Sequence, residues 1–174
     1  YYGSDSTIAP RDIAAEAQLW MEEIALEQAT TERPVSVIRA SNVQGVPITG
    51  PPGNGLLHRW ASEAPIGWVN VPGDGSDFKD FVHVQDLVEC IMRVMADPPP
   101  TRESIAIGSG KGIQLRDLAA IYNQMTGCEA EYGQNPDQEV FGIVDASEVE
   151  MRLGFRPTVS LEEMIRESFE ASGH

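Results

Sequence analysis

The run from Lys79 to Asp86 brings together four side chains that can carry charge. Lys79 offers an ammonium group, His83 an imidazole, and Asp80 and Asp86 two carboxylates. A histidine between two carboxylates is compatible with a metal site or with an acid–base pair. No other cluster supports a metal, because His58 and His174 lack partners at metal-ligand spacing.

His83 and Asp86 also have structural explanations. Period-two alternation in a strand at 81–84 puts His83 on the face of Phe81, with Val82 on the opposite face. Asp86 precedes an apolar helical pattern, so we expect it to cap that helix. We therefore expect His83 to be a hydrogen-bonded structural residue, and it remains an alternative catalytic base.

Glu16 is the other alternative base. It lies with further carboxylates on the first predicted helix, where a chain with 27 acidic residues is expected to have a solvated face. Burial beside a cavity would be needed for a catalytic role, since burial is what raises a carboxyl pKa toward neutrality.

The segment Gly108-Ser109-Gly110-Lys111-Gly112 invites comparison with a phosphate-binding loop. That motif requires a glycine five residues before its Gly-Lys pair and a Ser or Thr after it. Ile105 and Gly112 occupy these two positions. We therefore expect a turn in which glycine supplies positive φ.

Composition excludes several classes of function. The chain has 174 residues, 41% of them hydrophobic, and a formal charge of −15 with only 12 Lys and Arg, which argues against binding to nucleic acid. It contains no apolar run of membrane-spanning length and no secretory signal, so we expect no membrane association. Cys90 and Cys128 are too far apart in sequence to suggest a disulfide framework, which favours a cytoplasmic location.

Strands and helices are predicted to alternate, which indicates an α/β fold with parallel pairing in one domain, residues 1–174. A helix over 10–30 should bury one stripe of side chains. The stripe comprises Ile13, Ala17, Trp20, Met21 and Ile24. We predict strands at 34–39, 66–71, 81–84, 104–107 and 129–132, and helices at 56–64, 86–95, 114–126, 145–154 and from 160.

Five segments, in order, resemble the extended short-chain dehydrogenase/reductase family of NAD-dependent nucleotide-sugar epimerases and dehydratases. They are Tyr1-Tyr2-Gly3, Arg39-Ala40-Ser41-Asn42-Val43-Gln44-Gly45, the run from Gly73 to Asp86, Ile105-Ala106-Ile107-Gly108-Ser109-Gly110, and the stretch from Asp145 through Leu153-Gly154-Phe155-Arg156-Pro157 to Ser160-Leu161-Glu162-Glu163. The resemblance implies a partial Rossmann-like fold that lacks the N-terminal nucleotide-binding half and has a small C-terminal α/β substrate lobe.

The resemblance also implies a ligand and its contacts. The family binds NAD(P) and acts on sugars or nucleotide-sugars, and Asn42, Lys79 and Asn135 match positions that contact the substrate. Lys79 replaces the usual Arg, which loses the bidentate fork, and Asn135 stands where a second Arg is common. A diphosphate ligand and a neutral or singly charged sugar therefore both remain open.

The family's redox residues are replaced in this chain. The helix aligns with Ala14 in place of the catalytic Tyr and Gln18 in place of the Lys. Neither side chain can transfer a proton at neutral pH. The sequence also has no glycine-rich strand-turn-helix for a pyrophosphate, so we do not expect NAD to bind in the family's manner.

The sequence is compatible with three functions. The first is the substrate-binding half of an epimerase or dehydratase, the second a catalytically silent binding or assembly subunit, and the third a cofactor-independent isomerase or lyase that uses Glu16 or His83. The strand at 34–39 should leave a sheet edge that needs covering. We expect either a homo-oligomer or a missing N-terminal half, on the same or a separate polypeptide, to cover it.

Overall fold

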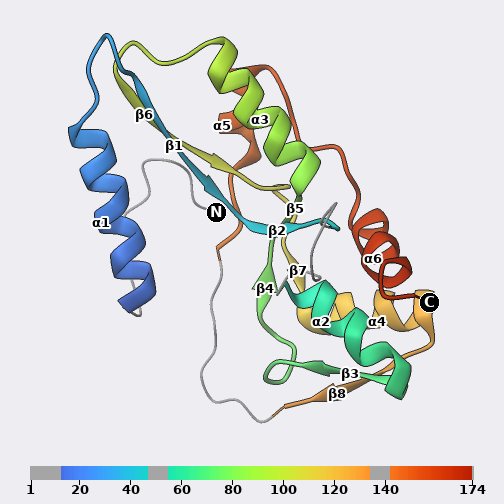
Figure 1. Ribbon diagram of the computed structural model, residues 1–174. Helices are drawn as coiled ribbons and strands as arrows, with labels where there is room; N and C mark the ends of the chain where they lie inside the picture. The colour runs from blue at the N-terminus through green and yellow to red at the C-terminus, as the bar shows by residue number, and fades with distance from the viewer. Residues whose placement is uncertain (1–12, 47–54, 134–141, 174) are drawn as a thin grey trace.

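The computed structural model describes residues 13–46, 55–133 and 142–173 (Figure 1). The elements follow in the order α1 (Ile13–Glu27), β1 (Val35–Ala40), β2 (Asn42–Gln44), α2 (Leu56–Glu63), a 3₁₀ turn (Ala64–Ile66), β3 (Trp68–Val71), β4 (Phe78–Lys79), β5 (Phe81–His83), α3 (Val84–Ala96), β6 (Arg102–Ile107), β7 (Ile113–Gln114), α4 (Leu115–Thr126), β8 (Glu129–Tyr132), α5 (Ala146–Leu153) and α6 (Leu161–Glu170). Within these ranges, no helix is both long and apolar enough to cross a membrane.

The first core forms around a parallel strand pair. β1 runs beside β6, with Val35 opposite Arg102 and Ala40 opposite Ile107. In Figure 1 the pair lies between α1 on one side and α3 and α5 on the other. The buried side chains of this core are Val82, Cys90, Val94, Ile105, Ile107 and Val149. Burial in β6 is confined to Ile105, Ala106 and Ile107 at its end, and every residue of β1 is partly buried.

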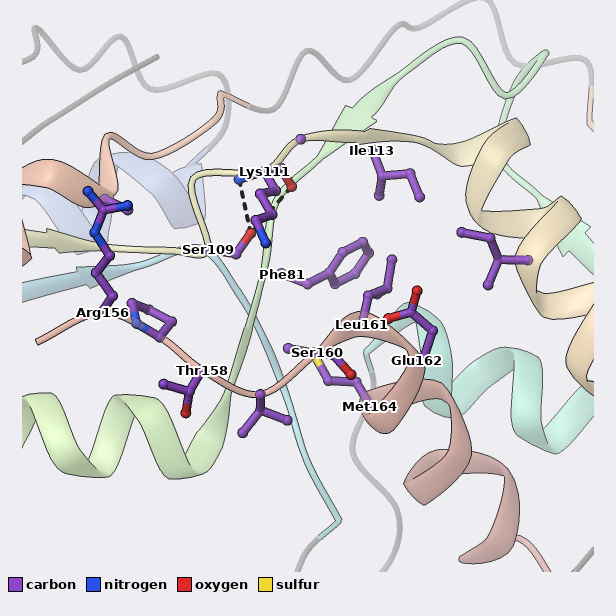
Figure 2. Close-up of a pocket in the computed structure, with 15 residues that line it drawn as sticks. Phe81, Ser109, Lys111, Ile113, Arg156, Thr158, Ser160, Leu161, Glu162 and Met164 are labelled. Carbon is purple, nitrogen blue, oxygen red and sulfur yellow. Dashed lines mark hydrogen bonds between the residues drawn. The ribbon is translucent and has the colours of Figure 1, made fainter.

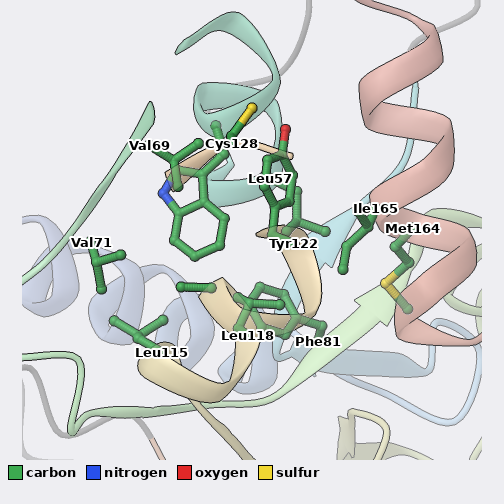
Figure 3. Close-up of a cluster of buried hydrophobic side chains, with 12 residues drawn as sticks. Leu57, Val69, Val71, Phe81, Leu115, Leu118, Tyr122, Cys128, Met164 and Ile165 are labelled. Carbon is green, nitrogen blue, oxygen red and sulfur yellow. The ribbon is translucent and has the colours of Figure 1, made fainter. Parts of the chain in front are cut away.

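The second core lies in a smaller lobe built from β3, β8, α2, α4 and α6 (Figure 3). β3 pairs in parallel with β8, and Trp60 meets Tyr122 edge to face with ring centroids 5.3 Å apart. The two lobes meet along the middle run of the chain, where β5 pairs with β2 and β4 pairs antiparallel with β7. This arrangement confirms the predicted partial Rossmann-like α/β fold with a small second lobe.

Several predicted element boundaries are confirmed at their caps. Gly127 and Gly154 end α4 and α5 with φ of 78° and 64°. The side chain of Asp145 accepts a hydrogen bond from the Ser147 amide at the start of α5. Ser160 and Glu163 form the predicted capping box of α6.

The predicted buried stripe of α1 is wrong. Ile13, Ala17, Trp20, Met21 and Ile24 are all exposed, with 64% of Trp20 accessible. The opposite side of α1, which includes the partly buried Leu19 and Glu22, faces the rest of the protein, and Arg39 of β1 donates to Glu22 from Nε at 2.9 Å and Nη2 at 2.7 Å. The spacing of apolar residues along α1 indicates a face that needs covering, but it does not identify what covers that face.

The predicted cap of α3 is also wrong. The helix begins at Val84, and His83 is its N-cap, with Nδ1 accepting from the Gln85 amide at 3.2 Å. Asp86 lies inside the first turn and is buried. An aspartate is favourable both at the N-cap and in the first turn of a helix, so the residue type alone could not distinguish these two positions.

Candidate functional site

Asn42 and Lys79 come together where the two lobes join. The backbone carbonyl of Asp80 accepts hydrogen bonds from the Asn42 amide at 3.1 Å and from Asn42 Nδ2 at 2.8 Å. Lys79 directly precedes Asp80, and only 8% of it is exposed. The third predicted contact, Asn135, lies outside the described residues.

The turn before Lys79 is held by its own side chains. Gly73 and Gly75 have φ of 58° and 74°, a region that suits glycine. Between them, Asp74 Oδ1 accepts from the Ser76 amide at 2.9 Å. Hydrogen bonds from the Ser76 hydroxyl, and then from its amide, hold the pKa of Asp74 below its usual value. These contacts fix the conformation of the turn, and therefore the direction in which β4 and Lys79 follow it.

The Asp80 carboxylate is fully buried and organises two other segments. Oδ1 accepts from the Ser109 amide at 2.9 Å and the Ser109 hydroxyl at 2.6 Å, while Oδ2 accepts from the amides of Gly110 at 3.3 Å and Val144 at 3.0 Å. Asp80 therefore joins the turn after β6, and the chain that follows segment 134–141, to the site. From the sequence alone, Asp80 is recognisable only as part of a possible metal or acid–base set.

Asp86 has a similar anchoring role. Its Oδ1 accepts from the Thr158 amide at 3.0 Å and the Thr158 hydroxyl at 3.3 Å, and Oδ2 accepts from the Val159 amide at 3.1 Å. A carboxylate that accepts several amide hydrogen bonds is satisfied without a cation. Both aspartates of the central run thus attach later parts of the chain to it.

His83 is buried and uses both ring nitrogens. Nδ1 accepts from Gln85, so the proton of the neutral ring is on Nε2, which lies 2.8 Å from Oε2 of Glu167 on α6. This tautomer makes Nε2–H the donor to Glu167. The geometry matches the predicted hydrogen-bonded structural histidine.

The remaining predicted site residues lie apart from this group. Glu16 is exposed in the first turn of α1, and Ala14 and Gln18 are exposed on the same helix. Among the residues that the structure describes, no three His, Cys, Asp or Glu side chains gather as a metal site. The segment from Gly108 to Gly112 forms a turn in which Gly110 has a φ of 73°, as predicted.

Comparison with known proteins identifies relatives that cover much of the chain. Residues 3–108 match the family described as the NAD dependent epimerase/dehydratase family. GDP-L-fucose synthase 1 of Arabidopsis thaliana is 30% identical over 105 residues, which are 59% of this chain and 32% of that protein. dTDP-L-rhamnose 4-epimerase of Burkholderia thailandensis is 29% identical over 157 residues, 79% of this chain and 39% of that protein.

Solved structures show the same fold. MoeE5 in complex with UDP-glucuronic acid and NAD aligns with a TM-score of 0.84 at 22% identity, covering 97% of this chain and 58% of MoeE5. The dTDP-glucose 4,6-dehydratase of Bacillus anthracis in complex with NAD aligns with a TM-score of 0.82 at 21% identity, covering 99% and 55%. The chain thus spans about a third of the first curated relative and somewhat over half of these solved chains.

Proposed function

Because the chain belongs to the NAD-dependent epimerase/dehydratase family, we propose that it forms the substrate-binding half of an enzyme that acts on a sugar or nucleotide-sugar. Asn42, Lys79 and Asn135 are the proposed substrate contacts. The relatives whose names mention GDP-, dTDP- and UDP-linked sugars support this substrate class. On this proposal, residues 1–174 act as one substrate-recognising domain.

The observation that carries the proposal is the fixed position of Lys79 beside Asn42. The strand pair and the Asp80 hydrogen bonds hold this cation at the junction of the lobes. Lysine supplies a point charge without the arginine fork, so it suits one phosphoryl or carboxylate oxygen.

The residues of α1 do not fit the family's use of NAD. Ala14 and Gln18 stand where the resemblance places the proton-transferring Tyr and its Lys, and both are exposed to solvent on α1. Neither can exchange a proton with a substrate hydroxyl at neutral pH. We therefore assign no redox step to these residues, and any NAD chemistry would need groups from elsewhere.

The sheet edge suggests where such groups would attach. β1 pairs with β6, and no other strand of the described residues pairs with β1. Trp20 of α1 and Met92 and Met95 of α3 leave apolar surface exposed in the same lobe. Unpaired strand groups beside apolar surface are usually covered. We propose that a nucleotide-binding half covers this edge, with a second copy of this chain as the alternative.

Two titrations of the purified chain test the proposal. UDP-glucose should bind saturably, and Lys79→Gln should weaken it about fivefold or more, by loss of one charged contact. Arg102→Gln, which removes an exposed charge from the start of β6, should leave the affinity unchanged. Equal affinities for the two variants would remove Lys79 from the site. Saturable NADH binding to the chain alone would overturn the assignment of the cofactor to a separate half.

The catalytically silent subunit is the second candidate, and Ala14 and Gln18 favour it. Incubation with UDP-glucose and NAD, followed by product analysis, separates the two when the nucleotide-binding half is also present. Sugar binding without any product supports the silent subunit. The cofactor-independent isomerase has less support, because Glu16 is exposed and His83 has both nitrogens hydrogen bonded.

A further inference from the structure

Apart from Asn42 and Lys79, the described residues enclose a cavity of about 510 Å³. It is bounded by the turn after β6, by α4, and by the segment that leads into α6 (Figure 2). Neither Asn42 nor Lys79 lines it. Its volume is within the range of small-molecule sites, yet the proposed sugar-binding function does not use it.

The walls of this cavity are fixed before any ligand arrives. Ser109 on one wall is held by the buried Asp80, and Thr158 on another by the buried Asp86. At the mouth, Ser160 is held by the capping box of α6. Their hydroxyl groups are already engaged within the protein. A ligand that binds here would therefore lose little free energy to ordering these walls.

The charges at the cavity are unusual for this chain. Lys111 and Arg156 both line it, although acidic residues outnumber basic ones by 27 to 12. Arg156 is paired with Glu150, on the side facing α5. Lys111 has no ion-pair partner within the part of the chain that the structure describes. In Figure 2 its side chain extends toward Phe81.

The floor of the cavity is apolar. Phe81, Ile113 and Leu161 surround the space beneath Lys111, and Glu162 stands at the far side (Figure 2). An apolar floor with a few convergent polar groups is the usual composition of a small-molecule site. The single carboxylate opposite Lys111 would repel a second anionic group on the same ligand.

We propose that this cavity binds a small organic anion that has one anionic head group and an apolar body. The head group pairs with the Lys111 ammonium, while the charge of Arg156 is already balanced by Glu150. The body lies against Phe81, Ile113 and Leu161. Phosphate and carboxylate head groups share this chemistry.

Calorimetric titration with phenyl phosphate and with benzoate tests the proposal and separates the two head groups. We expect saturable binding of at least one probe at one site per chain. Phenol has the apolar ring without the anionic head group, and inorganic phosphate has the anionic group without the ring. Both should therefore bind more weakly. Lys111→Gln should weaken binding about fivefold, as expected for one partly exposed charged contact. Arg33→Gln, a loss of charge in the exposed loop before β1, is the matched control.

Methyl NMR locates the probe independently of affinity. Ring-current shifts should appear at the methyl groups of Ile113 and Leu161, and not at Ile105 or Val149 of the other core. Lys79→Gln should leave phenyl phosphate binding unchanged while it weakens UDP-glucose binding, so this site and the proposed substrate site can fail separately. Absence of saturable binding by both probes, equal affinities for the Lys111 and Arg33 variants, or shifts confined to other methyl groups would overturn the proposal.

Discussion

The carboxylate of Asp80 accepts a hydrogen bond from the backbone N–H of Val144, at 3.0 Å and 64 residues further along the chain. The same carboxylate holds the Ser109 amide and hydroxyl. One buried side chain thus joins the strand that carries Lys79 to two distant segments. This contact explains how a short central run can organise both the proposed substrate contacts and the wall of the cavity that Lys111 lines.

Replacing Asp80 should therefore cost more stability than its size suggests. Asp80→Ala leaves several buried donors without an acceptor, and we expect a loss of about 3 kcal/mol in the free energy of unfolding. Asp80→Asn keeps the shape and should cost less. Urea unfolding followed by circular dichroism measures both. Glu129→Ala on the exposed side of β8 is the control, with a change within about 0.5 kcal/mol. A similarly small effect of Asp80→Ala would refute the anchoring role.

Substitution of the two tryptophans Trp60 and Trp20 should have very different effects on stability. Trp60 is fully buried against Tyr122, so Trp60→Ala should cost about 3–5 kcal/mol. Trp20→Ser should change the unfolding free energy of the isolated chain by about 0.5 kcal/mol or less, because its side chain is exposed on α1. Sedimentation velocity of the Trp20 variant should show less self-association than wild type if a second copy covers α1. A large loss of stability in the Trp20 variant would mean that α1 packs differently.

The cap of α5 should make stability depend on pH. Hydrogen bonds from the Ser147 hydroxyl, and then from its amide, lower the pKa of Asp145 below its ordinary 3.8. The ionised carboxylate is thus favoured in the folded state, and its stabilising contribution is present above pH 3.8 and is lost as pH falls through the folded pKa. Asp145→Ala should lower the urea midpoint at pH 7, and the gap to wild type should narrow below pH 3.8.

The comparison variant for this effect is Asp145→Ser, which keeps a capping oxygen without the charge. Its gap to wild type should also close at low pH, from a smaller starting value, because the wild-type carboxylate is then protonated. A gap between wild type and Asp145→Ala that stayed constant from pH 7 to pH 3 would contradict the assignment of the cap.

The thiol of Cys90 should be unreactive in the folded protein. Burial, and then the charge of Glu103, raise the pKa of Cys90 to about 11. At pH 8 only about one thiol in a thousand would be ionised, and the thiolate is the reactive form. Ellman's reagent should therefore label Cys90 in Cys128→Ser only after guanidinium is added. Stoichiometric labelling within minutes under native conditions would show that α3 opens from β1 and α5.

The sequence predicted the helices and strands well where their formation depends on residues that are close together in the chain. Glycine after an apolar helix, the capping box at Ser160 and the apolar strands need no knowledge of distant partners. The ordered motifs likewise identified the family and the partial fold. Asn42 and Lys79 were selected by resemblance. Asn42 bonds the backbone carbonyl of Asp80, the residue after Lys79, and the role of both as substrate contacts stays a prediction.

What the sequence could not reveal depends on partners far along the chain. The exposed stripe of α1 has the same spacing as a buried one, so periodicity could not distinguish them. Asp86 looked like a helix cap, whereas its acceptors are used by Thr158 and Val159. The cavity beneath Lys111 was missed for the same reason, since its walls come from segments that lie far apart in the sequence.

The parallel pairing of β1 with β6 carries a kinetic consequence. Val35 meets Arg102 and Trp68 meets Glu129, so both lobes close only after long stretches of chain have been synthesised. Loops of this length make the search for native contacts slow, because their entropy is lost before the contacts compensate it. A ribosome-bound chain that has emerged only as far as α3 would hold β1 without its β6 neighbour until the rest appears.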